Sequence, residues 1–278
     1  MTTVNHGKEN AEQVIKALEE ARAQNPELAS FYEFHQQVLQ LQHQAKAQIA
    51  ATLEMVDEQA LQSRLQQGLP LLSFAQLPIE EGRFANQVGK MVQVLTDYDP
   101  DLEAQAAPGN ADECLTLARQ RFEQAQVVEG PSTEQDQITL AQFAVDLALQ
   151  PYLEWAAEQM LPYVNHEEWK QGYCPICGAP PDLATLDEKV GTRHLLCSRC
   201  NSQWLYRRIG CPFCGVTDHT RLVYYPGEDE VYRLYVCQEC RRYLKAIDLR
   251  KATKKVLLPA ERVTTVAMDA AAREEGYW

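Results

Sequence analysis

Eight of the nine cysteines in this 278-residue chain lie between residues 174 and 240, where they form four Cys-x-x-Cys pairs. Such a turn presents two thiolates to one metal ion, and a second turn completes a tetrahedral four-sulfur site. Two pairs about 15–20 residues apart are the usual signature of one site. Here 19 residues separate the first two pairs and 22 separate the last two. The spacing predicts two metal sites with these ligands: Cys174, Cys177, Cys197, Cys200, Cys211, Cys214, Cys237 and Cys240.

The two halves of the cysteine region resemble repeats. Tyr-Cys-Pro-Ile-Cys-Gly at 173–178 matches Gly-Cys-Pro-Phe-Cys-Gly at 210–215. Gly178 and Gly215 are expected to adopt positive φ after the second cysteine of each turn, because glycine does so without strain. The match favours joining neighbouring turns, the first with the second and the third with the fourth. A crossed arrangement, the first with the third and the second with the fourth, stays open.

Three kinds of chemistry use Cys-x-x-Cys pairs. We favour structural metal sites. A thiol–disulfide redox protein carries the same motif, but its site occurs once, between a strand and a helix, whereas this chain has four knuckle-like turns. An iron–sulfur cluster also takes four cysteines, usually with uneven spacings. His194 and His219 lie near cysteine turns and could act as ligands, yet eight cysteines already complete two sites. The ninth cysteine, Cys114, is expected to be a small core residue.

Before residue 169 the sequence has the apolar periodicity of helices. We expect helices over 8–24, 26–53, 80–95 and 111–127, a helix that opens near Ser132 and continues to Leu149, and another that begins at Pro151. Residues 68–72 are expected to form a loop. The predicted class is α+β multidomain: an all-α helical domain at 1–168, two small rubredoxin-like (zinc-ribbon-like) four-cysteine metal modules at 169–208 and 209–251, and a C-terminal tail at 252–278 with a short helix around Met268 to Glu275.

Charge and hydropathy limit the classes of function. The net charge is −13, and residues 1–170 carry 10 Lys and Arg against 26 Asp and Glu. An acidic protein is a poor general binder of nucleic acid. No apolar run approaches the roughly 20 residues that span a bilayer, so membrane insertion is not expected. The N-terminus lacks a basic region followed by an apolar core, so we expect no secretory signal and a cytoplasmic location, where thiols stay reduced and available to metals.

Cations and aromatic side chains gather around the later cysteine turns. The cations are Arg207, Arg208, Arg241, Arg242 and Lys245. A zinc-ribbon nucleic-acid-binding protein would use such cations against phosphate, and this is the main alternative function. Aromatic residues between them could stack on bases, but a small core or a protein-binding face is the preferred interpretation. No arrangement of catalytic residues is visible, so we do not expect an enzyme.

Several segments together resemble the formate dehydrogenase accessory protein family FdhE. They are Gly-Leu-Pro-Leu-Leu at 68–72, Gln-Pro-Tyr-Leu-Glu at 150–154, Trp169, Gly-Tyr-Cys-Pro-Ile-Cys-Gly-Ala-Pro-Pro at 172–181, Gly-Cys-Pro-Phe-Cys-Gly at 210–215, Tyr-Val-Cys-Gln-Glu-Cys at 235–240 and Arg-Tyr-Leu-Lys-Ala-Ile-Asp at 242–248. The cysteine motifs alone are generic, but their combination with the other segments is specific.

The resemblance implies a helical domain followed by two rubredoxin-like modules. It also implies a non-enzymatic cytoplasmic assembly chaperone that binds the catalytic subunit of formate dehydrogenase during maturation. In that family the cysteine pairs hold metal, and iron is the suggested ion. A four-thiolate tetrahedron accepts iron or zinc, so two iron ions are expected, with zinc as the alternative.

Overall fold

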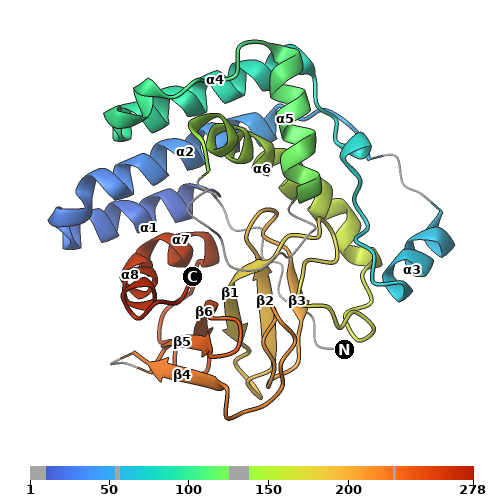
Figure 1. Cartoon of the computed structure of the whole chain (residues 1–278), viewed down its shortest axis with the longest axis vertical. Helices are drawn as coiled ribbons and strands as arrows, with labels where there is room; N and C mark the ends of the chain where they lie inside the picture. The colour runs from blue at the N-terminus through green and yellow to red at the C-terminus, as the bar shows by residue number, and fades with distance from the viewer. Residues whose placement is uncertain (1–10, 54–56, 125–137, 228–229) are drawn as a thin grey trace.

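A computed structural model describes residues 11–53, 57–124, 138–227 and 230–278 (Figure 1). Helices precede the cysteine region and strands occupy it, as predicted. The helices are α1 (Ala11–Gln24), α2 (Ala29–Ala47), α3 (Glu58–Gln66), α4 (Glu81–Tyr98), α5 (Ala111–Gln124), α6 (Leu140–Met160), α7 (Leu258–Thr264) and α8 (Val266–Glu274). The strands are β1 (Pro181–Leu186), β2 (Arg193–Cys197), β3 (Gln203–Leu205), β4 (Leu222–Pro226), β5 (Tyr232–Cys237) and β6 (Tyr243–Asp248).

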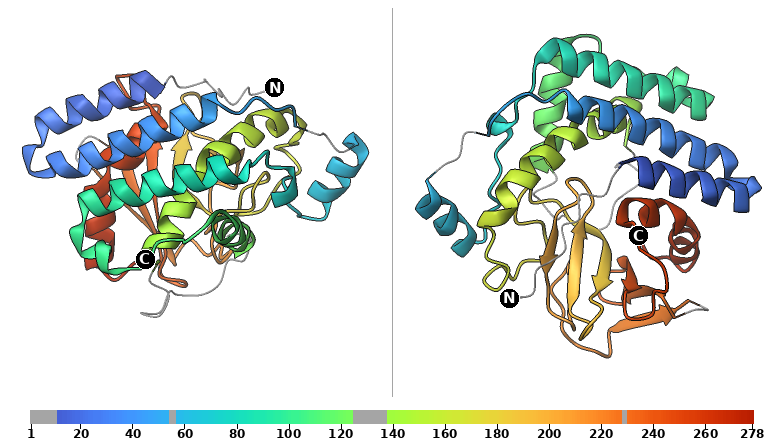
Figure 2. Two further views of the ribbon diagram at one scale, coloured as in Figure 1. Left: turned by 90° about the horizontal axis from the view of Figure 1, so that it is seen from above. Right: turned by 180° about the vertical axis from the view of Figure 1, so that it is seen from behind.

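Helix α6 is the centre of the helical region. It is apolar on most of its circumference, with Leu140, Val145 and Leu149 among its buried residues, and α2, α4 and α5 pack around it. A helix that is hydrophobic all round must be enclosed by other elements. Figure 2 shows the surrounding helices from two further directions. The predicted start of this helix near Ser132 lies outside the described residues.

The prediction that Pro151 begins a new helix was wrong, because Pro151 lies inside α6. A proline within a helix lacks the N–H that would bond to the carbonyl four residues earlier. Here that carbonyl belongs to Leu147, and the side-chain amide of Gln42 donates to it at 2.9 Å. Gln42 is almost fully buried on α2. A neighbouring helix thus supplies the hydrogen bond that the proline removes, and α6 continues.

The strands form one six-stranded sheet in the order β3-β2-β1-β6-β5-β4. Each predicted module contributes three consecutive antiparallel strands, β1–β3 and β4–β6. The modules meet where β1 and β6 pair in parallel, with Leu183 opposite Lys245 and Leu186 opposite Asp248. Because this pairing joins the two central strands, the two modules share one sheet, which the sequence did not reveal.

The C-terminal segment packs against the rest of the molecule. Val263 of α7 shares an apolar cluster with Val14 and Leu18 of α1, while Ala272 of α8 packs with Leu234 and Val236 of β5. The predicted short helix near Met268 is α8. Helices α7 and α8 therefore lie between the helical region and the second half of the sheet (Figure 1).

Candidate metal centres

The eight predicted cysteines lie in two groups of four. Cys174, Cys177, Cys197 and Cys200 form what we call the first centre, and Cys211, Cys214, Cys237 and Cys240 form the second centre. The Sγ atoms within each group all lie within 4.8 Å of one another. Neighbouring turns are joined, as the simpler arrangement expected, and the crossed arrangement is not formed.

The sulfur–sulfur distances fit a tetrahedral ion. In the first centre three pairs of sulfurs are 3.4, 3.5 and 3.6 Å apart, and in the second centre two pairs are 3.6 and 3.7 Å apart. Metal–sulfur bonds of about 2.3 Å in a tetrahedron place the sulfurs about 3.8 Å apart. A disulfide would need about 2.05 Å. Each group could therefore hold one metal ion.

All four cysteine turns share one backbone pattern. The N–H of Cys174 donates to the carbonyl of Ala179 at 2.9 Å, and the N–H of Cys211 donates to that of Val216 at the same distance. The residue after the second cysteine has positive φ, 78° at Gly178 and 77° at Gly215, as predicted. This conformation brings the two sulfurs of a turn to the same side.

The two partner turns repeat the pattern without glycine. Cys197 N–H donates to the carbonyl of Ser202 and Cys237 N–H to that of Arg242, both at 2.9 Å. The residues with positive φ are Asn201 at 56° and Arg241 at 60°. Asparagine tolerates this region and arginine does so rarely, so this feature of the site could not be expected from residue type at Arg241.

In the first centre, hydrogen bonding acts in the same direction as burial on the pKa of Cys174 and against it on the pKa of Cys197. Burial raises the pKa of Cys174 and of Cys200 well above the usual value. Burial also acts on Cys197, yet hydrogen bonds from the three other thiols and from the Cys200 amide lower its pKa. Four thiolates in a buried space require a cation, because unpaired charges are costly there. The donor set and its burial thus fit a divalent metal.

The second centre already favours thiolate at one ligand. Hydrogen bonding from Cys240 lowers the pKa of Cys211 to about 5, against the effect of burial and with help from the amides of Cys214 and Phe213. The same interaction, seen from the other side, raises the pKa of Cys240. The two thiols therefore interact strongly with each other, and a cation between them could take the place of a proton.

The other residues considered as ligands lie elsewhere. Both groups of potential ligands found in the described ranges consist of cysteine alone, so neither His194 nor His219 is among them. His194 lies within β2 opposite Leu205. Cys114 is buried on α5, where burial and the Glu113 carboxylate raise the pKa of its thiol. A reactive thiol needs the opposite shift, so Cys114 is a core residue.

Contacts between the two modules were missed by the sequence reasoning. Gly172, just before the first cysteine turn, packs so closely on the third turn that a Cβ at residue 172 would lie 1.8 Å from the carbonyl oxygen of Pro212. Arg193 of β2 is buried and donates to the carbonyl of Gly210 at 2.9 Å, while its guanidinium lies over the rings of Tyr206 and Tyr235. In the sequence, the only sign of these contacts between the modules is Gly172, which lies next to the first cysteine motif.

Three of the five predicted cations serve internal packing. Lys245 is buried and bonds to the carboxylate of Asp269 at 2.7 Å. Arg241 lies over the ring of Tyr277, and Arg242 lies over the ring of Trp278, with 4.1 Å between the guanidinium carbon and the ring centre in each case. Arg207 and Arg208 are exposed, as Arg241 is, and Arg207 also donates to the carbonyl of Gly215. The alternative of a nucleic-acid-binding protein therefore has fewer cations available for phosphate than the sequence suggested.

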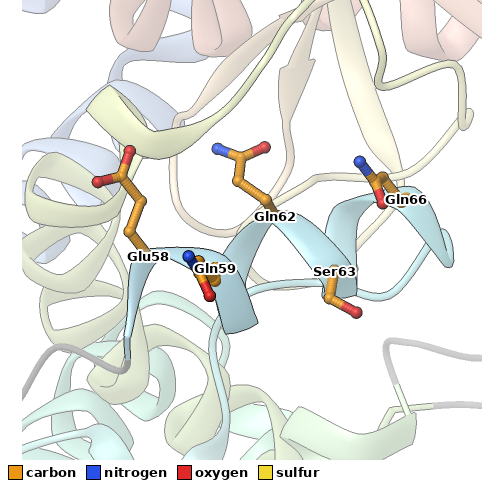
Figure 3. A pocket seen from close by; sticks show the side chains of 5 residues that line it. All are labelled: Glu58, Gln59, Gln62, Ser63 and Gln66. Carbon is orange, nitrogen blue, oxygen red and sulfur yellow. The ribbon is translucent and has the colours of Figure 1, made fainter.

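Two surface depressions lie away from the cysteine centres. One, of about 360 Å³, is lined by polar side chains that all come from α3, namely Glu58, Gln59, Gln62, Ser63 and Gln66 (Figure 3). The other, of about 180 Å³, lies between α4 and the start of α5, with Cys114 in its wall. Groups from a single helix do not converge on a ligand, and the second depression has no charged side chain in its wall. The cysteine centres therefore remain the candidate functional site.

In the described part of the chain, no helix combines the length and the apolar character needed to cross a bilayer.

Comparisons with known proteins agree with this architecture. Residues 173–208, which contain the first centre, match the family model described as FdhE, central domain. A protein FdhE homolog from Aquifex aeolicus is 26% identical over 91% of this chain and 87% of its own length. Another, from Stutzerimonas stutzeri, is 32% identical, but the alignment covers 40% of this chain and 37% of that protein.

A solved structure has the same fold. The crystal structure of the FdhE protein from Pseudomonas aeruginosa aligns with a TM-score of 0.57 and 22% identity, covering 96% of this chain and 91% of that one. The predicted class, helices followed by a strand-rich region with two groups of four cysteines, is confirmed.

Proposed function

We propose, from the confirmed resemblance to the FdhE family, that this chain is an accessory protein for the maturation of formate dehydrogenase. In this proposal it is not an enzyme, and it binds the catalytic subunit of formate dehydrogenase through a metal-stabilised scaffold. The observation that carries the proposal is the presence of two four-cysteine centres in a chain that resembles FdhE proteins along nearly its whole length.

The metal-binding part of the proposal assigns all eight cysteines as ligands of two ions. Residues 169–208 and 209–251 are the two metal modules, carried by a helical domain at 1–168 and followed by 252–278. Iron is the proposed ion and zinc the alternative, because a tetrahedral set of four thiolates suits both. A bound ion would supply the positive charge that keeps four thiolates stable together, and its binding energy would contribute to folding.

A genetic experiment tests the accessory role. Deleting the gene should abolish formate dehydrogenase activity in the host, and wild-type protein supplied from a plasmid should restore it. A plasmid carrying Cys114→Ala should also restore activity as wild type does, because this cysteine lies outside both centres. Tagged protein should also retain the catalytic subunit during purification. Normal formate dehydrogenase activity in the deletion strain would refute the proposal.

A further inference from the structure

The two centres differ in access to solvent. In the first centre Cys174, Cys177 and Cys197 are 0% exposed and Cys200 is 3% exposed. The second centre has Cys211 and Cys237 buried, but Cys240 is partly exposed and Cys214 is exposed. Two of its four sulfur ligands therefore belong to residues that reach the surface. A ligand from solution can approach an ion there, whereas the first centre presents no exposed cysteine.

The first centre is enclosed by the main core. Its four cysteines belong to the same apolar cluster as the helices around α6. The loop predicted at 68–72 lies against its first turn, where the N–H groups of Leu71 and Leu72 donate to the carbonyls of Pro175 and Ile176 at 2.9 Å. On the other turn, Arg199 bonds to the carboxylate of Asp146 on α6. Opening this centre would require the helical region and the sheet to separate.

The turn that carries Cys211 and Cys214 is held by groups other than its sulfurs. Arg193 donates to the carbonyl of Gly210 at 2.9 Å, and the hydroxyl of Tyr206 donates to that of Cys211 at 3.0 Å. Arg207 donates to the carbonyl of Gly215 at 3.3 Å. All three donors come from the segment before the second module. They would keep this turn in place after an ion has left.

The turn that carries Cys237 and Cys240 is held from its own side. Cys237 ends β5, and the residue after Cys240, Arg241, donates to the carbonyls of Glu275 and Gly276. The N–H of Trp278 donates back to the carbonyl of Arg241 at 2.9 Å. Both halves of the second centre are thus positioned by contacts that do not require the ion. A site held in this way could lose and regain an ion without unfolding.

We propose that the second centre is an exchangeable metal site, while the first centre keeps its ion as long as the chain stays folded. The inference rests on the proposed assignment of the eight cysteines as metal ligands. The incoming ligand is a thiolate or a multidentate chelator that approaches beside Cys214 and Cys240. One bond from the ion to the incoming ligand forms as one bond to a cysteine sulfur breaks, and the released thiolate takes up a proton from water. No electrons are transferred.

The rate of zinc release tests the inference. Full-length protein carrying two zinc ions is mixed with excess 4-(2-pyridylazo)resorcinol, and the coloured zinc complex is followed with time. One equivalent should leave fast and one slowly, with rates that differ by at least about tenfold, a barrier difference of about 1.4 kcal/mol. Circular dichroism should stay unchanged after the fast phase, and added zinc should refill the site without a refolding step.

Two variants assign the phases. Cys214→Ser should remove or accelerate the fast equivalent and leave the slow rate as in wild type. Cys114→Ala, outside both centres, should change neither phase. Release of both equivalents at one rate, or loss of the slow phase in Cys214→Ser, would overturn the inference while leaving the metal-ligand assignment intact. Binding of fewer than two zinc ions by the wild-type chain would instead refute the assignment, and the inference with it.

Discussion

Replacing Gly172 with alanine tests how closely the two modules are packed. A Cβ at this position would lie 1.8 Å from the carbonyl oxygen of Pro212 and 2.6 Å from its carbonyl carbon, while ordinary contacts begin at 3.4 Å. These are backbone atoms, so the third cysteine turn would have to move by about 1.6 Å to reach ordinary contact. Gly172 is not among the residues with positive φ, so alanine meets no backbone strain of its own.

The expected free-energy change follows from two opposing effects. Overpacking of this kind costs about 1–3 kcal/mol, whereas alanine restricts the unfolded chain and stabilises by about 0.4–1 kcal/mol. Gly172→Ala should therefore destabilise the metal-loaded protein by about 1–2 kcal/mol, which lowers Tm by roughly 2–4 °C per kcal/mol. Because the turn that moves carries Cys211 and Cys214, the second centre should also release zinc faster.

Gly89→Ala is the matched control. Gly89 lies on α4, and a Cβ there would meet nothing within 4 Å. Alanine is the better helix former by about 1 kcal/mol, so this variant should raise Tm and leave zinc release unchanged. If Gly172→Ala were as stable as wild type with the same zinc release, the close contact between the modules would be wrong.

Two further substitutions test other contacts. Gln42→Ala should destabilise the protein by about 1 kcal/mol because the Leu147 carbonyl loses its donor. In a Pro151→Ala background the backbone N–H of residue 151 returns, so the loss caused by Gln42→Ala in a double-mutant cycle should be smaller. An equal loss in both backgrounds would contradict this. Hydrogen bonds from Arg250 lower the pKa of Asp248 despite its burial. The ionised Asp248 carboxylate therefore stabilises the fold above the unfolded-state pKa of about 3.9. This stabilisation is lost as the pH falls through the pKa of Asp248 in the folded protein. Asp248→Asn should therefore lower Tm at pH 7 and flatten the decline of Tm below about pH 4; an unchanged acid limb would contradict this.

Much of the candidate site could be predicted because its information is local. The spacing of the cysteine pairs specified two groups of four, and Gly178 and Gly215 indicated their positive φ. The helix–strand division followed from periodicity. The positive φ depends on a single turn, and the periodicity depends on a single helix or strand. The cysteine groups depend on turns that lie only 19 and 22 residues apart in the chain, a spacing that is itself a known signature of a four-cysteine site.

The remaining features depend on contacts between distant segments. Pro151 stays inside α6 because Gln42, more than a hundred residues earlier, donates to the Leu147 carbonyl that the proline leaves without a backbone donor. The joining of β1 to β6 depends on pairing between residues about sixty positions apart. Arg241 adopts positive φ where the C-terminal segment accepts its hydrogen bonds. No local pattern encodes these partners, so the shared sheet and the unequal exposure of the two centres emerge only from the structure.

X-ray absorption spectroscopy of anaerobically purified full-length protein, combined with elemental analysis, tests the central claim most directly. Two ions per chain, iron or zinc, should each show a first shell of four sulfur atoms, at about 2.3 Å for zinc. A first shell containing nitrogen or oxygen from the protein, fewer than two bound ions, or a disulfide within either group of cysteines would contradict the assignment of two four-cysteine metal centres.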